Sequence, residues 1–175
     1  MSTNQTPWAL MSYRVPRRPA SQYMRIRRQF ERLGLIGLQR GLVAHPATPE
    51  IEAELEDLAT SIRNIPGAIA LVWRAEPTDE GQMVSAFNTS CDVEYEDICS
   101  AAKAILSSIP ERGRLSAADR LELRRLIRRF ERIDKRDILG ATGGAKTRAL
   151  MAECRQVVAP TSRSRNLTIL HASQT

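Results

Sequence analysis

The order of apolar segments in the first 75 residues is the feature that most constrains the fold of this chain. Aromatic and β-branched residues indicate strands over Trp8–Val15 and Ala68–Ala75, and two short apolar runs around Arg40-Gly41 indicate a β-hairpin. Between these strands, apolar residues recur at helical spacing after the N-cap candidates Ser21 and Thr48. The predicted order is therefore β-α-β-β-α-β. This is the order of a ferredoxin-like domain, a four-stranded antiparallel sheet with both helices on one face.

The chain after residue 76 has the pattern of helices. Apolar stripes indicate one helix over Asp92–Ile109, a second from Ser116 to Arg136 and a third over Lys146–Val158. We expect the stripe of the second helix to cover the sheet domain. The fold class is thus α+β, and its expected parts are a ferredoxin-like domain over 8–76, a helical extension packed on it over 84–158, and flexible tails over 1–7 and 159–175.

Charge is segregated along the chain, although the net charge is only +6. Arg14–Arg40 holds eight arginines and one acid, whereas Ala47–Ser100 holds twelve acids and two arginines. Glu111–Asp137 then holds ten basic and six acidic residues. Arginine presents a planar, bidentate group to phosphate, so two blocks rich in arginine rather than lysine favour a nucleic-acid partner.

The two basic blocks differ in where they place their arginines. In the first, Arg14, Arg17 and Arg18 follow a strand and are our better phosphate candidates. The alternative for Arg25, Arg28 or Arg32, which lie on the helix, is an ion pair with Glu52 or Glu56. In the second, outward arginines of an amphipathic helix can follow a DNA backbone without reading its bases. The alternative interpretation of both blocks is that their arginines are exposed to water and bind no partner. The predicted nucleic-acid-binding residues are Arg14, Arg17, Arg18, Arg25, Arg28, Arg124, Arg128 and Arg132.

Several of these segments together resemble a known family. Trp8–Pro16, the Arg-rich helix ending at Leu33-Gly34 and the hairpin ending at His45-Pro46 resemble the amino-terminal region of ChrB-type chromate-resistance proteins. Arg129–Gly140 resembles the closing segment of that region, with Ile138 and Leu139 where aromatic residues are expected. The resemblance spans about residues 8–158. It implies a chromate-responsive transcriptional regulator of a chromate-efflux operon. Longer members carry a second, carboxy-terminal domain, and a separate partner chain is one candidate source of such a domain here.

A weaker resemblance is to the middle domain of PaaX-type repressors and, behind it, to small metal-dependent nucleases of CRISPR adaptation. Those nucleases hold a metal ion through a carboxylate at the end of the first strand, because hard divalent cations prefer oxygen ligands. This chain has Arg14 there, and a guanidinium repels a cation. We therefore reject the nuclease interpretation.

The sequence offers no convincing catalytic, metal or cofactor site. Three cysteines without CxxC spacing and two histidines make a zinc site improbable, although Cys154 beside Arg155 is the most plausible reactive thiol. The segment Gly140–Thr147 resembles a phosphate-binding loop but has Ala145 where that loop requires glycine. We expect a non-enzymatic protein without cofactor. The lack of an apolar run of ~18 residues and of a signal peptide indicates a cytoplasmic protein with no membrane contact.

Two functions from different classes follow. The first is a ChrB-like transcriptional regulator that binds DNA through its Arg-rich surfaces. The alternative is a protein–protein adaptor or dimeric scaffold, in which the acidic middle meets the basic ends of the same chain or of another subunit. The expected partners are DNA, and as further candidates a second copy of the chain and a separate carboxy-terminal chain.

Overall fold

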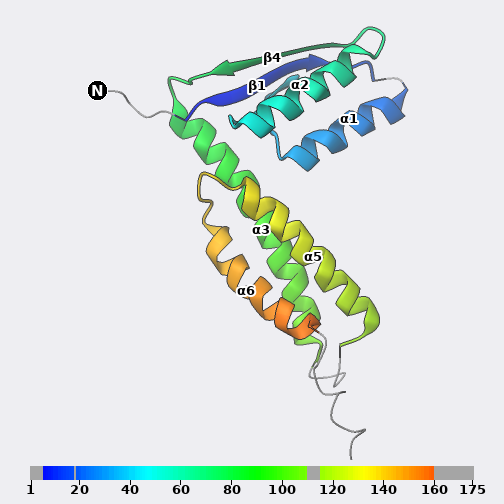
Figure 1. The fold of residues 1–175 in the computed structure, drawn as a ribbon, viewed down its shortest axis with the longest axis vertical. Coiled ribbons are helices and arrows are strands. Elements are labelled where there is room, and N and C mark those ends of the chain that lie inside the picture. Colours follow the sequence, from blue (N-terminus) through cyan, green and yellow to red (C-terminus); the bar gives the residue numbers. More distant parts are fainter. Residues whose placement is uncertain (1–5, 18, 110–114, 160–175) are drawn as a thin grey trace, which may run out of the picture.

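The computed structural model describes residues 6–17, 19–109 and 115–159. It contains a four-stranded sheet with two helices, followed by three further helices (Figure 1). In chain order the elements are β1 (Trp8–Arg14), α1 (Ala20–Leu33), β2 (Ile36–Gln39), β3 (Leu42–Pro46), α2 (Pro49–Arg63), β4 (Ile69–Ala75), α3 (Glu80–Ser107), α5 (Ala117–Arg136) and α6 (Gly143–Val158).

The predicted order of the first six elements is confirmed. The strands lie in the order β2-β3-β1-β4, and each neighbouring pair is antiparallel. Thr48 caps α2 as predicted, because its hydroxyl accepts a hydrogen bond from the amide of Ile51. The predicted cap of α1 is wrong by two residues: Pro19 occupies the N-cap position instead of Ser21, with an extended backbone that suits proline.

The two faces of the sheet bury different groups of side chains. Ala9 and Met11 of β1 pack with Ile26 and Leu55 on the face that α1 and α2 cover. Figure 1 shows these two helices together on one side of the sheet. Trp8 of β1 lies on the opposite face, and its ring contacts Phe87 of α3 edge-on with 6.1 Å between ring centroids. This alternation is what a strand buried on both faces requires.

The first helix after the sheet is longer than predicted. It begins at Glu80, twelve residues before the predicted start at Asp92, and Asp79 caps it. Phe87 and Cys91 are fully buried and continue the apolar stripe toward the sheet, whereas Val93 is 59% exposed. The early turns are rich in polar residues, so their helical pattern is weak in the sequence, and burial of Phe87 against Trp8 helps to stabilise them.

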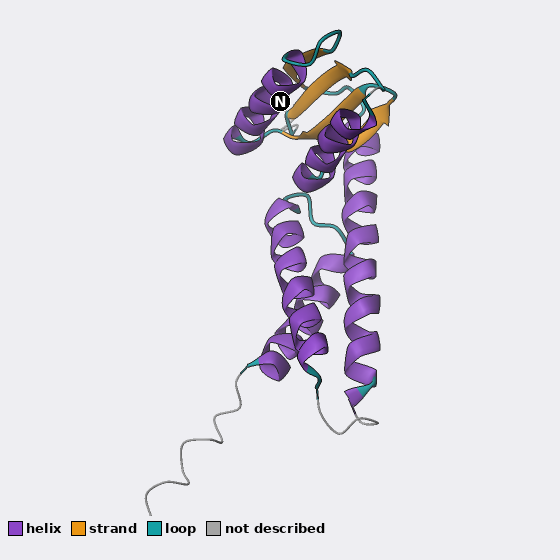
Figure 2. Cartoon of the chain, turned by 90° about the vertical axis from the view of Figure 1, so that its right-hand side faces the viewer, coloured by secondary structure: helices purple, strands orange, loops and turns teal. Residues whose placement is uncertain are grey.

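The last three helices form a bundle that extends away from the sheet (Figure 2). The capping box predicted at Ser116 is present at the start of α5. The expectation that the stripe of α5 covers the sheet domain is wrong, because Leu126, Phe130 and their neighbours pack mainly against α3 and α6. The apolar sides of α3 and α6 therefore cover this stripe, as in other helix bundles.

The junction between bundle and sheet domain is built around Arg136, at the end of α5. Its guanidinium forms an ion pair with Glu94 of α3, and its side chain packs against the backbone of Gly34. Beside it, the hydroxyl of Tyr95 donates a hydrogen bond to Asp137 at 3.1 Å. These contacts place the C-terminal end of α5 next to the end of α1.

Candidate nucleic-acid interface

The described arginines fall into two groups, according to whether they form an ion pair with an acidic side chain. The paired group comprises Arg27, Arg32, Arg63, Arg74, Arg125, Arg129, Arg136, Arg148 and Arg155. The arginines without an ion pair to any described residue are Arg14, Arg17, Arg25, Arg28, Arg40, Arg120, Arg124, Arg128 and Arg132. All of the predicted nucleic-acid-binding arginines that the structure describes belong to this second group. Arg18 lies outside the described residues.

The first basic block does not form one continuous surface. Arg14 ends β1 and shares the strand face of Trp8 and Leu10, opposite α1 and α2. Arg25 and Arg28 are exposed on α1, on the other side of the sheet, and Arg17 lies in the loop between β1 and α1. The sheet therefore separates Arg14 from the two helical arginines.

The expected contacts between α1 and the acids of α2 are only partly present. Arg32 pairs with Glu54 at 3.5 Å, whereas Glu52 and Glu56 pair with Arg74 and Arg63 instead. Neither Arg25 nor Arg28 reaches a carboxylate in the described chain, so the prediction that they might face Glu52 or Glu56 is wrong.

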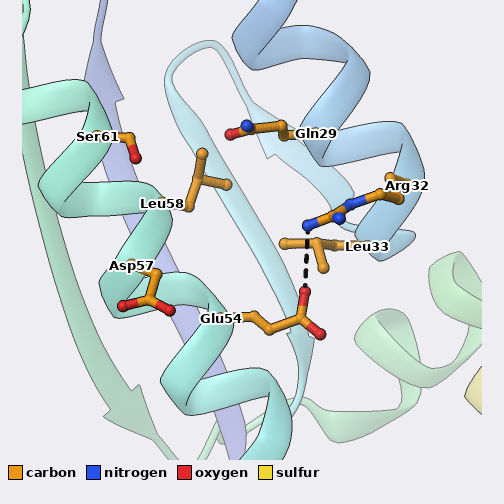
Figure 3. A pocket seen from close by; sticks show the side chains of 7 residues that line it. All are labelled: Gln29, Arg32, Leu33, Glu54, Asp57, Leu58 and Ser61. Atoms are coloured by element: carbon orange, nitrogen blue, oxygen red, sulfur yellow. Dashed lines mark hydrogen bonds and ion pairs between the residues drawn. The ribbon is translucent and has the colours of Figure 1, made fainter.

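A groove of about 320 Å³ lies between α1 and α2, around the Arg32–Glu54 pair (Figure 3). Gln29 and Leu33 line it from α1, and Asp57 lines it from α2. The guanidinium in this groove is already paired, and the carboxylate of Asp57 adds negative charge. The groove is therefore unsuited to a phosphate.

The second basic block forms a regular row on α5. Arg124, Arg128 and Arg132 are spaced by four residues, so they follow one side of the helix with a rise of about 6 Å between successive Cα atoms. All three are exposed, while the buried Leu126, Phe130 and Ile133 fix the opposite side of α5 in the bundle. We call these three residues the arginine row.

A shallow hollow of about 480 Å³ runs along the arginine row. Its lining residues are Arg125, Arg128, Glu131, Arg132 and Lys135. Glu131 is neutralised by Arg155 of α6, at 3.0 Å, and Arg125 is paired with Glu122. Lys135, which is not among the predicted nucleic-acid-binding residues, extends the row toward the sheet domain. The sequence signal for Lys135 was its position three residues after Arg132, because residues three apart are neighbours on the surface of a helix.

The buried titratable groups are poorly placed for catalysis. Cys91, Cys99 and Cys154 are all buried, and burial raises the pKa of the Cys154 thiol despite the neighbouring Arg155. The suggestion that Cys154 is the most reactive thiol therefore loses its basis. Burial also lowers the pKa of His45 to about 4, so its imidazole is neutral at pH 7. Across residues 6–17, 19–109 and 115–159, no group of acidic, histidine or cysteine side chains is arranged to hold a metal ion.

The glycine-rich segment that resembles a phosphate-binding loop has a structural role. Gly143 begins α6, and its amide donates to the carboxylate of Asp92 at 2.7 Å. The hydroxyl of Thr142 donates to the second oxygen of the same carboxylate. An anion from α3 thus already occupies the N-terminus of α6, where a phosphate would otherwise bind. Thr147 is buried and contacts Cys99.

None of the helices in the described ranges is long and apolar enough to cross a membrane.

A family model described as "Protein ChrB, N-terminal" matches residues 24–165. The match begins within α1, so β1, whose sequence contributed to the resemblance, precedes it. No curated protein matches the chain.

Proposed function

This chain belongs to the ChrB N-terminal domain family, and from that membership we propose that it is a transcriptional regulator of chromate resistance that binds DNA through its unpaired arginines. The observation that carries the proposal is the separation of the arginines into two groups. The strand order and the order of connections also lead us to propose a ferredoxin-like classification for the sheet domain.

The unpaired arginines are available to a phosphate without the loss of an internal contact. An exposed ion pair contributes only ~0–1 kcal/mol to stability, but an arginine must still give up that contact before it binds a ligand. Arg124, Arg128 and Arg132 have no such contact within the described chain. Each of these side chains also carries a guanidinium group, which can donate two parallel hydrogen bonds to two oxygens of one phosphate.

The arginine row is the part of the surface best suited to a DNA backbone. Its members are evenly spaced on a helix whose opposite side is held in the bundle, so the three guanidinium groups can each reach a separate phosphate with little ordering of the main chain. Contacts of this kind position a protein on DNA but do not select a base sequence. Sequence preference would have to come from other groups, such as Arg14 or Arg17 near the end of β1.

The direct test compares duplex DNA from the gene's own upstream region with a scrambled duplex, by fluorescence anisotropy at several salt concentrations and with or without chromate. The regulator predicts tighter binding to the native duplex and release by chromate. Equal, salt-sensitive binding to both duplexes would reduce the proposal to a nonspecific basic surface. Absence of binding to either would reject it.

The arginine row is tested with a charge-matched pair of triple variants. The first carries Arg124→Gln, Arg128→Gln and Arg132→Gln; the control carries the same change at three paired residues away from the hollow, Arg27, Arg129 and Arg148. Each phosphate contact contributes about 0.9 to the slope of log affinity against log salt, so the first variant should reduce that slope by about 2–3. The control should reduce it much less. Equal reductions would mean that net charge alone matters.

The adaptor or scaffold remains a second candidate, but its original basis is weakened. Glu52, Glu54 and Glu56 of the acidic middle are paired with arginines of the same domain, so they offer little free charge to another subunit. A different feature favours a protein partner, namely the exposed apolar side chains of β4. An adaptor predicts a stable oligomer and no DNA binding at ~150 mM salt, where surface charges are strongly screened.

A further inference from the structure

Three large apolar side chains of β4 are exposed side by side. Ile69 is 47% exposed, Leu71 60% and Trp73 39%. They are two residues apart, so they point to the same face of the sheet, opposite the face that α1 and α2 cover. We call these three residues the β4 patch.

The β4 patch is open because α3 covers only part of that face. Ala75, at the end of β4, lies opposite Trp8 and packs in the cluster that includes Phe87 of α3. From there toward the start of β4, the patch residues Trp73, Leu71 and Ile69 lie opposite Leu10, Ser12 and Arg14 of β1. A row of exposed aliphatic and aromatic side chains is costly in water unless a partner covers it.

The outer edge of β4 is also unpaired in the described part of the sheet, where this strand is the last in the order. Arg63 donates to the carbonyl of Ala70 at 3.2 Å, which shows that the backbone groups of Ala70 point away from β1. Because these directions alternate in an antiparallel strand, those of Val72 and Arg74 point outward as well. Arg63 uses one lone pair of the Ala70 carbonyl, and the second lone pair remains, with the backbone groups of Val72 and Arg74, for another strand.

Proteins usually protect such edges, and the opposite edge of this sheet is protected. β2 has only four residues, and its pairing with β3 shifts register after Gly37. β4 has seven residues, and Arg74 is its only charged side chain. A long, nearly neutral, apolar edge strand is a site for strand addition.

We propose that β4 is the interface of a homodimer, in which the β4 strands of two copies pair antiparallel about a two-fold axis near Leu71. In this arrangement Leu71 lies beside Leu71 of the partner subunit, and Ile69 lies opposite Trp73 of the partner subunit. The two four-stranded sheets become one continuous sheet, and the two patches form one apolar surface. The inference does not depend on the proposed DNA binding.

A second copy fits this edge better than other partners. A two-fold axis at Leu71 places Ile69 of each copy against Trp73 of the other, so the patch pairs with itself, as an isologous interface requires. The side of β4 toward α2 carries two ion pairs, Arg63–Glu56 and Arg74–Glu52, so the charges of these four side chains are balanced beside the edge that a second copy would approach. A single-stranded nucleic acid would need several aromatic rings to stack on, but two of the three patch side chains are aliphatic.

The test is the mass of the full chain in solution, measured by light scattering after size exclusion over a range of concentrations. The monomer mass is 19.6 kDa, and the proposal predicts twice that value. Leu71→Asp should weaken self-association by about 30-fold or more, the loss typical of a central interface residue. Val93→Asp is the matched control, because Val93 is equally exposed, at 59%, but lies on α3. It should leave the dimer intact.

Hydrogen exchange provides a second measurement that does not require a variant. The amides of Val72 and Arg74 should exchange slowly at dimeric concentrations and rapidly after dilution, whereas amides that bond to β1 should not change. A monomeric wild-type chain, a Leu71→Asp variant that still dimerises, or exchange at Val72 and Arg74 that is independent of concentration would each overturn the proposal. A monomer whose Trp73 fluorescence responds to single-stranded DNA would also reject it, in favour of a nucleic-acid surface.

Discussion

Replacing Gly34 with alanine tests how the bundle is joined to the sheet domain. Gly34 ends α1 with a φ of 67°, a left-handed conformation that costs an alanine about 1–2 kcal/mol. A Cβ at this position would also overlap the Nη1, Cδ and Cζ atoms of Arg136. Gly140 has a similar φ of 74°, but a Cβ there would meet no atom of the described chain within 4 Å. The two positions therefore separate the backbone cost from the cost of moving Arg136.

The second cost follows from the surroundings of Arg136. Its side chain is 10% exposed and forms an ion pair with Glu94, which is 28% exposed. If the guanidinium is displaced, the carboxylate of Glu94 loses its partner in a partly buried site. Breaking a fully buried pair costs about 3–5 kcal/mol, so this more accessible pair should cost about 2–3 kcal/mol. We expect the free energy of unfolding to fall by about 1–2 kcal/mol in Gly140→Ala and by about 3–5 kcal/mol in Gly34→Ala.

Urea unfolding of the full chain, followed by circular dichroism, measures both changes. A double-mutant cycle with Arg136→Ala then isolates the contact, because in that background Gly34→Ala should cost only the backbone term of about 1–2 kcal/mol. Equal costs for Gly34→Ala and Gly140→Ala would refute the reasoning. So would a cost of Gly34→Ala that is the same with and without Arg136.

Three further predictions concern the buried side chains. Burial lowers the pKa of His45 from 6.5 to about 4. Between pH 6.5 and pH 4 the imidazole is therefore protonated in the unfolded chain but neutral in the folded chain. The free energy of unfolding should fall by about 3 kcal/mol as the pH drops through this range. His45→Gln should remove this contribution, which pH-dependent urea unfolding would reveal as a shallower slope. Tyr95→Phe removes the hydrogen bond to Asp137 and should cost about 1.5–3 kcal/mol; an unchanged melting temperature would contradict this role. In a thiol-titration assay of the native protein, the three cysteines should react slowly and reach full reaction only on unfolding; rapid labelling of the folded chain would contradict their burial.

The outcome for the candidate interface shows what charge patterns can and cannot predict. The arginine blocks are visible in the sequence, and the described arginines chosen from them are unpaired. At α1, Arg32 rather than Arg25 or Arg28 meets an acid of α2. Which arginine reaches which carboxylate depends on the packing of two helices, and spacing along one helix does not contain that information.

The sequence by itself determined the order of elements over residues 8–75 and the family, because strand and helix periodicity, caps and turns act over a few neighbouring residues. Only the tertiary structure decided the early start of α3, the partners of α5 and the openness of the β4 patch. Leu71 belongs to an apolar run typical of a buried strand, yet it is 60% exposed because α3 crosses the sheet at Trp8 instead. Packing between elements that are distant in the sequence decides which apolar surfaces meet. The local sequence of a strand is the same whether or not another element covers it, so it cannot indicate which face stays exposed.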